Sequence, residues 1–190
     1  MFVDYLTLLL INMIAGLATL VIYVVKGLDD PNQSKWAPAF ALPGLIALVI
    51  GLHLALTWPL PGPYNAAFGD LTVLFGILFL GAAFAIAKGW DLLPLGIYAF
   101  FAGLAAVLVG VRIIHLGLTS QPILSGLGFI LTGLGGIFAA PVLYCRSNKL
   151  LRYLGAAVLT VAVLLWALTG YLGYWMHLES FAKWMPPTMR

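Results

Sequence analysis

The stretch His53-Leu54-Ala55-Leu56-Thr57 recurs as His115-Leu116-Gly117-Leu118-Thr119, and a third copy is reduced to His177-Leu178. These are the only histidines in the chain, and the step is 62 residues both from 53 to 115 and from 115 to 177. A fixed period of this length is typical of repeated supersecondary units. The spacing predicts three repeats, covering about residues 1–62, 63–124 and 125–190.

A second motif repeats with the same period but lies elsewhere in each copy. Lys26-Gly27-Leu28-Asp29 recurs 62 residues later as Lys88-Gly89-Trp90-Asp91, whereas the third copy reads Leu150-Leu151-Arg152-Tyr153. We therefore expect three helical hairpins, each ending in a helix with a histidine at its outer end. Three consecutive hairpins predict pseudo-threefold symmetry.

The composition is typical of a protein that lies within a lipid bilayer. Hydrophobic residues make up 63% of the 190 residues and charged residues only 8%, and the mean hydropathy is +1.08. Six apolar stretches are each long enough to span a bilayer core, which takes about 20 helical residues. They cover residues 5–25, 37–57, 71–87, 94–116, 122–144 and 153–178. The sequence predicts an all-α integral membrane protein with one transmembrane domain over residues 1–190.

The basic residues predict the orientation, because short loops rich in Lys and Arg remain cytoplasmic. The connections after the first, third and fifth stretches carry Lys26, Lys35, Lys88, Arg146, Lys149 and Arg152, whereas those after the second and fourth carry none. We expect both termini outside a plasma membrane and all three histidines on the outer face.

The proline-rich loop after the first histidine motif reads Trp58-Pro-Leu-Pro-Gly-Pro-Tyr64-Asn65. Proline disfavours helix at the preceding residue, so the second helix should end at Trp58. We expect the loop to fold over an outer mouth, with Trp58, Tyr64 and Asn65 near a ring of histidines. Asp70 is predicted to begin the third helix beside it.

The three histidines permit several interpretations. Each can be a polar group at the membrane interface. Converging on an axis, His53, His115 and His177 would suit Zn²⁺ or Cu²⁺, because three imidazoles leave one coordination position open. They would also suit a pH sensor at a pore mouth, because imidazole titrates near neutral pH. Haem ligation is a further alternative.

Arg112 is a charged residue within a predicted membrane helix, and such residues normally face a cavity or a partner. It lies three residues before His115 and so on nearly the same helix face. Arg112 either extends to the outer interface or points inward. In the second case its candidate partners are Asp70 and Glu179, with Asp4 on the same side.

Two further helix features concern the interior. Asn12 is a candidate pore-lining residue, because its amide can donate to and accept from a small polar solute. Small residues four apart in the fifth segment are typical of close helix packing, with a narrow pore wall as the alternative. They are Gly128, Thr132, Gly136 and Ala140.

Several short motifs resemble known membrane protein families. The patterns Phe75-Gly76, Ala82-Ala83, Gly89-Trp90-Asp91, Pro94 and Tyr98 resemble the AmiS/UreI family of urea channels and amide transporters. The runs 57–65 (TWPLPGPYN) and 68–70 (FGD) are more similar to a family of small membrane proteins called DUF981. The acetate/succinate transporter family is a more distant likeness.

The resemblance to urea channels implies six-helix protomers with outer termini, a pore within each protomer and a hexameric ring. It implies that pore-lining aromatic positions of the third helix fall on Ile77 and Gly81 here. Because neither residue is aromatic, the departure argues against urea itself as the solute.

The expected function is a channel or facilitator for a small, largely uncharged polar solute such as an amide, urea, ammonia or a protonated short acid. The alternative is a metal- or haem-binding membrane protein, or an accessory subunit of a larger complex. No nucleophile elbow, P-loop, HExxH or paired-carboxylate motif predicts an enzyme. The expected partners are the bilayer, the solute and further copies of the chain, with no nucleic acid and no resident cofactor.

Overall fold

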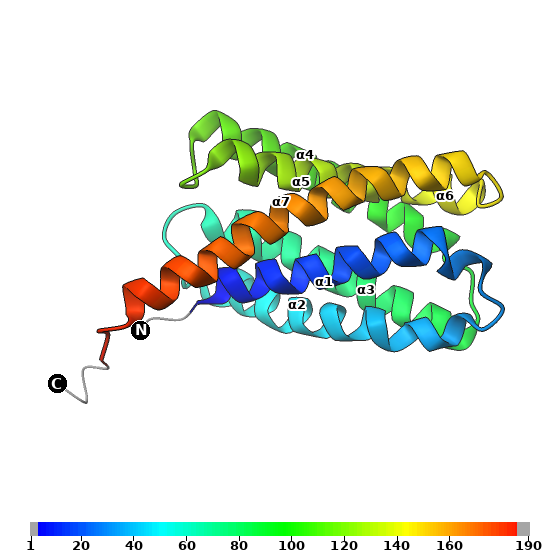
Figure 1. The fold of residues 1–190 in the computed structure, drawn as a ribbon, viewed down its shortest axis with the longest axis horizontal. Helices are drawn as coiled ribbons and strands as arrows, with labels where there is room; N and C mark the ends of the chain where they lie inside the picture. The colour runs from blue at the N-terminus through cyan, green and yellow to red at the C-terminus, as the bar shows by residue number, and fades with distance from the viewer. Residues whose placement is uncertain (1–3, 186–190) are drawn as a thin grey trace.

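The computed structural model describes residues 4–185, and the regular structure in this range is helical (Figure 1). The α-helices are α1 (Tyr5–Val25), α2 (Ala37–Thr57), α3 (Leu71–Lys88), α4 (Leu93–Leu116), α5 (Pro122–Ile137), α6 (Ala139–Tyr144) and α7 (Lys149–Phe181). Two 3₁₀ helices, η1 (Gly27–Asp29) and η2 (Gln33–Trp36), lie between α1 and α2, and a π-helical segment, η3 (Asn65–Asp70), leads directly into α3.

The predicted membrane segments agree closely with the observed helices. The bounds of α1 and α2 are those expected, and α4 begins one residue earlier than predicted. α7 extends beyond the predicted 153–178 at both ends. Within the described residues, five helical segments are long and apolar enough to cross a membrane, namely 5–25, 33–57, 65–88, 93–116 and 149–181.

The fifth predicted segment, 122–144, is not one continuous helix, which corrects the expectation. It is divided into α5 and α6 at Phe138, whose backbone has φ −87° and ψ 0°. Pro141 provides the reason, because it has no N–H to donate to the carbonyl of Ile137 and its ring clashes with that carbonyl. The Phe138 N–H still donates to the Leu134 carbonyl at 2.9 Å, so the break is a sharp bend and not a loop.

The start of the third helix also differs from the prediction. The helical backbone does not begin at Asp70 but extends back to Asn65 through η3, so Asp70 lies inside a continuous helical stretch. Its side chain caps no helix and is exposed.

The long helices form a ring around a common centre. The most extensive packing is that of α4 with α5, α2 with α3 and α1 with α7, and smaller contacts join α1 to α2, α3 to α4 and α5 to α7. The first and last helices therefore close the ring, and Figure 1 shows α1 and α7 side by side. Each close pair joins two of the predicted repeats, not two helices of one repeat.

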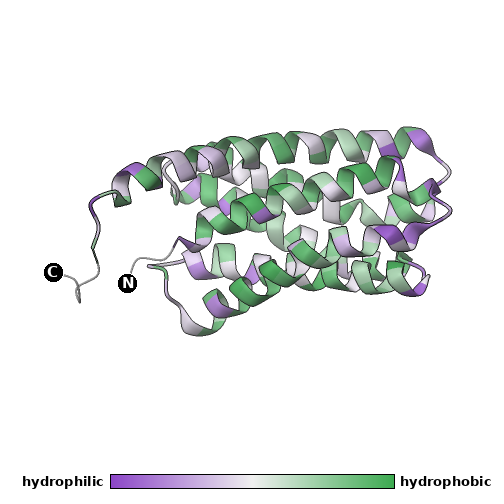
Figure 2. Ribbon diagram, turned by 60° about the horizontal axis from the view of Figure 1, so that its bottom comes forward, coloured by the Kyte–Doolittle hydropathy of each residue, from purple (hydrophilic) through white to green (hydrophobic). Residues whose placement is uncertain are grey.

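The two ends of the ring differ in character. The terminal end, as we call it, holds residues 4 and 182–185 and the loops 58–64 and 117–121 (Figure 1). The basic end holds residues 26–36, 89–92 and 145–148, together with all six basic residues predicted to be cytoplasmic. Figure 2 shows the hydrophilic positions gathered towards the two ends and an apolar middle.

Glycines bring α4 and α5 into very close contact. Gly103 of α4 lies where an added Cβ would be 2.4 Å from the Gly133 carbonyl oxygen, and at Gly110 it would be 2.6 Å from the Gly126 carbonyl oxygen. Contacts this short need glycine, because any side chain would have to displace backbone atoms. A rigid α4–α5 pair follows.

The predicted small-residue face of the fifth segment is split between two neighbours. Gly136 faces the backbone of α4, as a packing face should, and Ala140 lies against Gly96 of α4. Gly128 and Thr132 instead face Trp166 of α7. The rotation of α5 therefore directs Gly126, Gly133 and Gly136 towards α4, and Gly128 and Thr132 towards α7.

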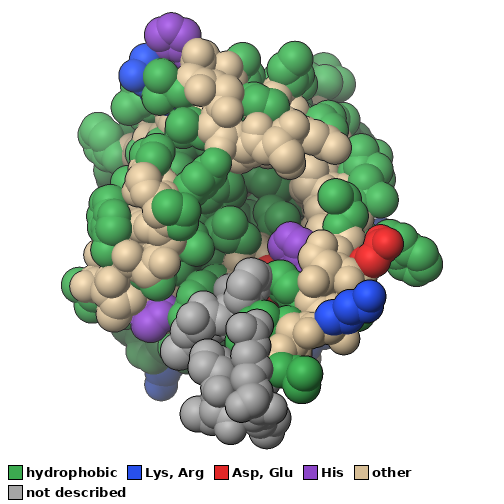
Figure 3. Space-filling view, turned by 90° about the vertical axis from the view of Figure 1, so that its left-hand side faces the viewer, with side chains coloured by type: hydrophobic (Ala, Val, Ile, Leu, Met, Phe, Trp, Pro, Cys, Tyr) green, Lys and Arg blue, Asp and Glu red, His purple; other side chains and the backbone are tan. Residues whose placement is uncertain are grey.

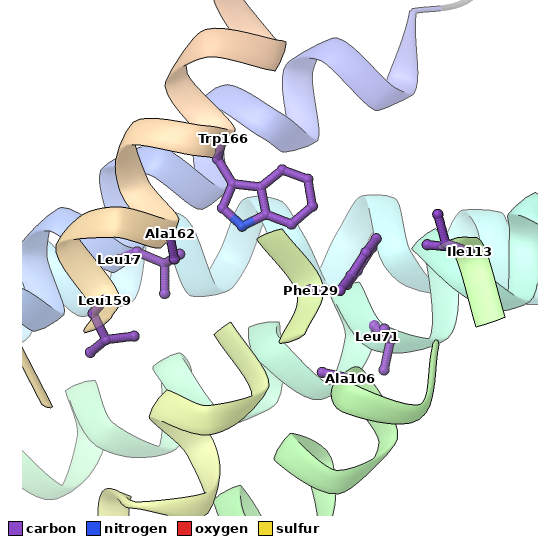
Figure 4. Close-up of a cluster of buried hydrophobic side chains, with 8 residues drawn as sticks. All are labelled: Leu17, Leu71, Ala106, Ile113, Phe129, Leu159, Ala162 and Trp166. Carbon is purple, nitrogen blue, oxygen red and sulfur yellow. The ribbon is translucent and has the colours of Figure 1, made fainter. Parts of the chain in front are cut away.

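A cluster of buried side chains from five helices lies inside the ring. Figure 4 shows the indole of Trp166, from α7, beside the ring of Phe129 from α5. These rings meet edge to face with centroids 5.1 Å apart. The cluster consists of Leu17, Leu71, Ala106, Ile113, Phe129, Leu159, Ala162 and Trp166.

The outer surface of the ring is apolar. Leu108 and Leu164, in the middle of α4 and α7, are 66% and 63% exposed, and Leu56 near the end of α2 is 80% exposed. A water-soluble monomer rarely exposes apolar surface on this scale. The long apolar helices and this surface are compatible with a multi-pass membrane protein.

Candidate functional site

A cavity of about 400 Å³ lies at the centre of the helix ring, in the half nearer the basic end. On α1 the lining begins at Met13, and on α7 it ends at Leu159, so it stops short of the terminal end. Every long helix contributes to the wall. Representative lining residues are Met13, Leu20, Phe40, Phe75, Leu78, Phe79, Ala82, Ala99, Ala102, Gly135, Leu154 and Val158.

The wall of the cavity is almost entirely apolar. The two side chains with a hydroxyl are Tyr23 and Thr132, and no charged side chain lines the cavity among the described residues. The Tyr23 hydroxyl donates to Gln33 at 2.9 Å. The Thr132 hydroxyl donates to the Gly128 carbonyl at 2.8 Å and accepts from the Trp166 indole N–H at 3.0 Å. Both hydroxyls are therefore already engaged within the protein.

Aromatic side chains separate this cavity from the terminal end. Tyr64 stacks on Phe68 with centroids 6.2 Å apart, Phe68 contacts Phe129 at 5.4 Å, and Phe129 contacts Trp166. This aromatic series crosses from the 58–64 loop to the centre of the ring. At the terminal end itself, the face is hollowed in its middle and walled by hydrophobic side chains (Figure 3).

The three residues expected to line a pore do not line the cavity. Ile77 is 43% exposed, and Gly81 packs against Leu95 of α4. Asn12 is buried, and its amide nitrogen donates to the Pro43 carbonyl of α2 at 2.9 Å. The predictions are wrong here because Asn12 joins two helices, while the face of α3 that carries Ile77 points out of the ring.

The aromatic residues of α3 that do line the cavity are Phe75 and Phe79. They stack with centroids 4.1 Å apart, and Phe79 contacts Phe40 of α2 at 5.4 Å. Their four-residue spacing places them on one helix face. This spacing is visible in the sequence, but nothing in the sequence tells this apolar face of α3 from the others.

The structure does not bring the three histidines together. His53 shares a hydrogen bond of 2.9 Å with the Tyr5 hydroxyl, and the Arg112 guanidinium donates to His115 at 2.8 Å. His177 bonds Asp4 at 2.8 Å and Thr7 at 3.0 Å. Histidine side chains stand apart on the terminal face (Figure 3).

The predicted three-histidine ring is accordingly not formed. Within residues 4–185 no three His, Cys, Asp or Glu side chains are grouped closely enough to hold a metal ion. The period of 62 places each histidine near the same end of its helix, as expected. The helix rotation and the neighbouring helix then give each imidazole a different partner.

Arg112 is exposed on the outside of α4. Within residues 4–185 its guanidinium hydrogen-bonds to His115. The suggested acids are not its partners, because Asp70 and Glu179 are exposed and neither forms an ion pair in the described chain. Of the two interpretations, extension to the membrane interface fits this position, and an inward-facing charge does not.

Hydrogen bonds hold the proline-rich loop to η3, which follows it, and to the end of α4. Asn65 is fully buried; its side-chain oxygen accepts from the Leu60 N–H at 2.9 Å, and its amide donates to the Leu60 carbonyl. The Tyr64 hydroxyl donates to the Leu118 carbonyl just after α4. Trp58 is 54% exposed and takes a left-handed backbone, with φ 49°. The loop therefore spans from α2 to α4 at the terminal end, without a histidine ring beneath it.

Sequence reasoning missed Arg152, which is 2% exposed at the start of α7. Its guanidinium donates to the carbonyls of Val24 and Val25 at 2.8 Å each and to both carboxylate oxygens of Asp29 at 2.9 Å. It therefore satisfies the end of α1 and joins the two helices that close the ring. A signal existed, because a base in the first turn of a helix opposes the helix dipole and needs a compensating partner.

The contact of Asp4 with His177 predicts a pH-dependent stability. Burial raises the pKa of Asp4, but hydrogen bonds from Thr7 and His177 outweigh it, and the pKa lies below the ordinary 3.8. A carboxylate with a lowered pKa in the folded state stabilises the fold above its unfolded pKa and loses this effect as the pH falls through the folded value.

We expect Asp4→Asn to destabilise the protein by about 1 kcal/mol or less near neutral pH, because the pair is partly exposed. The difference from the wild type should shrink below about pH 4. Asn keeps the helix-capping acceptor for Thr7, so the charge is the main change. Unfolding in detergent micelles across pH measures this, with Glu179→Gln as an exposed control. A constant difference at every pH would contradict the assignment.

Comparison with known proteins gives one match. A family model described as "Protein of unknown function (DUF981)" matches residues 1–180. No curated protein and no solved structure matches the chain. Nothing found links it to the urea channels or amide transporters, so the hexamer expected from that resemblance stays a prediction.

Proposed function

The chain thus belongs to the DUF981 family of proteins of unknown function, and we propose that it lets small uncharged solutes cross a membrane through the centre of its helix ring. In this proposal six segments span the plasma membrane, with α5 and α6 together forming the fifth. Both termini lie on the same side, as three hairpins require, and the distribution of charge supports assigning that side to the outside.

The distribution of charge supports this orientation. The basic end carries five exposed bases, Lys26, Lys35, Lys88, Arg146 and Lys149. Beyond α7, at the terminal end, the described residues include one base, Lys183. Bases in short connections favour the cytoplasmic side. The basic end is therefore assigned to the cytoplasm, and the cavity lies in the cytoplasmic half.

The central apolar cavity carries the proposal. Placing an amide in apolar surroundings without a hydrogen bond costs about 2–7 kcal/mol, and an isolated ion costs far more. Since the Tyr23 and Thr132 hydroxyls already donate their hydrogens within the protein, the wall has no free side-chain donor for the carbonyl of urea or an amide. Ammonia and protonated short acids fit this wall better than the more polar members of the expected class.

The aromatic contact of Phe129 with Trp166 provides the constriction in this proposal. It lies between the cavity and the hollow of the terminal face, and it is held by the hydrogen bond from Trp166 to Thr132. Passage of a solute then requires these two rings to separate. An apolar constriction of this kind passes neutral molecules and resists ions.

The test is flux into proteoliposomes that enclose a pH-sensitive dye. Pulses of acetic acid and of an ammonium salt should change the internal pH faster in protein-containing vesicles than in protein-free ones. Ala82→Phe places a ring inside the cavity and should return the rate towards that of lipid alone. Ala87→Phe, on the exposed face of the same helix, is the matched control and should leave the rate unchanged. Equal rates with and without protein would reject the proposal.

A further inference from the structure

The wall of the central cavity meets the outer surface of the protein at the bend between α5 and α6. A second cavity of about 320 Å³ lies there, lined on one side by Ile97 and Phe100 of α4 and on the other by Ile137, Ala140 and Pro141. Gly96 and Phe138 line both cavities. The two cavities therefore share a boundary at these two residues.

The helix bend places Phe138 at this boundary. Pro141 interrupts the helix, so the backbone at Phe138 departs from helical geometry. At Gly96 the wall is closely packed, because Ala140 lies where a side chain of residue 96 would be. The Phe138 side chain is 48% exposed, in a surface region that is otherwise apolar. The Phe138 ring is packed on one side only, and it can therefore change rotamer with little loss of contact.

We propose that the central cavity binds a lipid-soluble apolar molecule, aliphatic or aromatic, that enters from the bilayer past Phe138. The proposal rests on the membrane location proposed above and names the class of ligand for the same cavity. A water-soluble ligand would reach the cavity through charged loops, whereas the half-exposed Phe138 lies on the apolar outer surface of the ring.

The size of the cavity limits the ligand. An engineered cavity of about 150 Å³ lined by Leu, Ile and Phe stays dry and binds benzene. The present cavity of about 400 Å³ has the same kind of lining and more than twice that volume. It therefore suits a ligand of two or three ring-sized groups, or a short acyl chain, and not a whole phospholipid.

Photolabelling in liposomes tests the proposal with a medium-chain aliphatic diazirine as the probe. After illumination, peptide mapping should find adducts on cavity residues such as Leu78 and Val158, besides the adducts that any lipid-facing residue acquires. An excess of unlabelled alkane should suppress the cavity adducts and leave those on the exposed Leu164. Adducts confined to outward-facing residues would overturn the proposal.

Two pairs of variants separate occupancy from entry. Ala82→Phe should reduce the cavity adducts several-fold, while Ala87→Phe should not. Phe138→Ala should speed their formation, while Phe84→Ala, another half-exposed phenylalanine, should not. Cavity adducts that form at the same rate in Phe138→Ala and the wild type would overturn entry at this point. Each variant is compared only after its helix content and size-exclusion profile match those of the wild type.

The labelling result and the flux result are independent. Cavity adducts without protein-dependent flux would reject the proposed facilitator and leave the binding site standing. Flux of acetic acid or ammonia without cavity adducts would do the reverse, because a small solute needs no bilayer entrance.

Discussion

Arg152→Leu is expected to lower the free energy of unfolding by about 2–5 kcal/mol. The side chain is 2% exposed. Its loss leaves the last two carbonyls of α1, those of Val24 and Val25, without the hydrogen-bond donor that Arg152 provides. It also removes the ion pair with Asp29 that holds α7 against α1. Unfolding by sodium dodecyl sulfate titration in mixed micelles measures the change.

Matched variants separate this effect from a simple loss of positive charge. Arg146→Leu removes an exposed base at the same end and should change the stability by about 0.5 kcal/mol or less. Asp29→Asn should have an intermediate effect, because the Asp29 side chain is 60% exposed and water can replace the pair. If Arg152→Leu were as stable as Arg146→Leu, the assigned closure of the ring would be incorrect.

Gly103→Ala is the second substitution with a large expected effect, about 1–3 kcal/mol of lost stability. The new methyl group would lie 2.4 Å from the Gly133 carbonyl oxygen and 2.7 Å from the Ile137 backbone nitrogen. Both are backbone atoms, so the contact is relieved only by moving α5 away from α4. The same micelle titration, with cross-linking between α4 and α5 as a second readout, measures the change.

Gly155→Ala is the control for this substitution. Gly155 also lies inside a helix, but its added methyl group would meet only the Val142 side chain, at an ordinary 3.6 Å. It should be neutral or slightly stabilising, since alanine favours helix more than glycine does. A similar loss in both variants would show that helix propensity or insertion, and not the close approach of α4 and α5, sets the outcome.

The extent of each membrane helix could be predicted because the bilayer imposes a length and an apolar composition. Residues 5–25 and 37–57 were expected as helices and form α1 and α2 with those bounds. A kink was expected equally at Pro38, Pro43 and Pro141, but the helix is interrupted only before Pro141, and Pro43 lies inside the continuous α2. Proline is tolerated within many membrane helices, so its presence alone does not predict a break.

The inward faces could not be predicted in the same way. In a soluble protein the polar face of a helix shows which side is outside, but here lipid and core are both apolar, so Ile77 and Phe75 have the same character. Asn12 was expected to face a pore, but its amide donates to the Pro43 carbonyl and so joins α1 to α2. The histidine period likewise predicted a shared end of the ring, but not the separate partners Tyr5, Arg112 and Asp4.

The contact of α1 with α7 also has a consequence for biosynthesis. A ribosome delivers α1 first and α7 last, so the Arg152 contact with α1 joins segments more than 100 residues apart in the chain. Until α7 leaves the translocon, the nascent chain is an open arc whose pairs α2–α3 and α4–α5 are already close in sequence. The cavity then comes into existence in a single late step, and a chain truncated before Lys149 would present quality-control proteases with an unclosed arc and the bare end of α1.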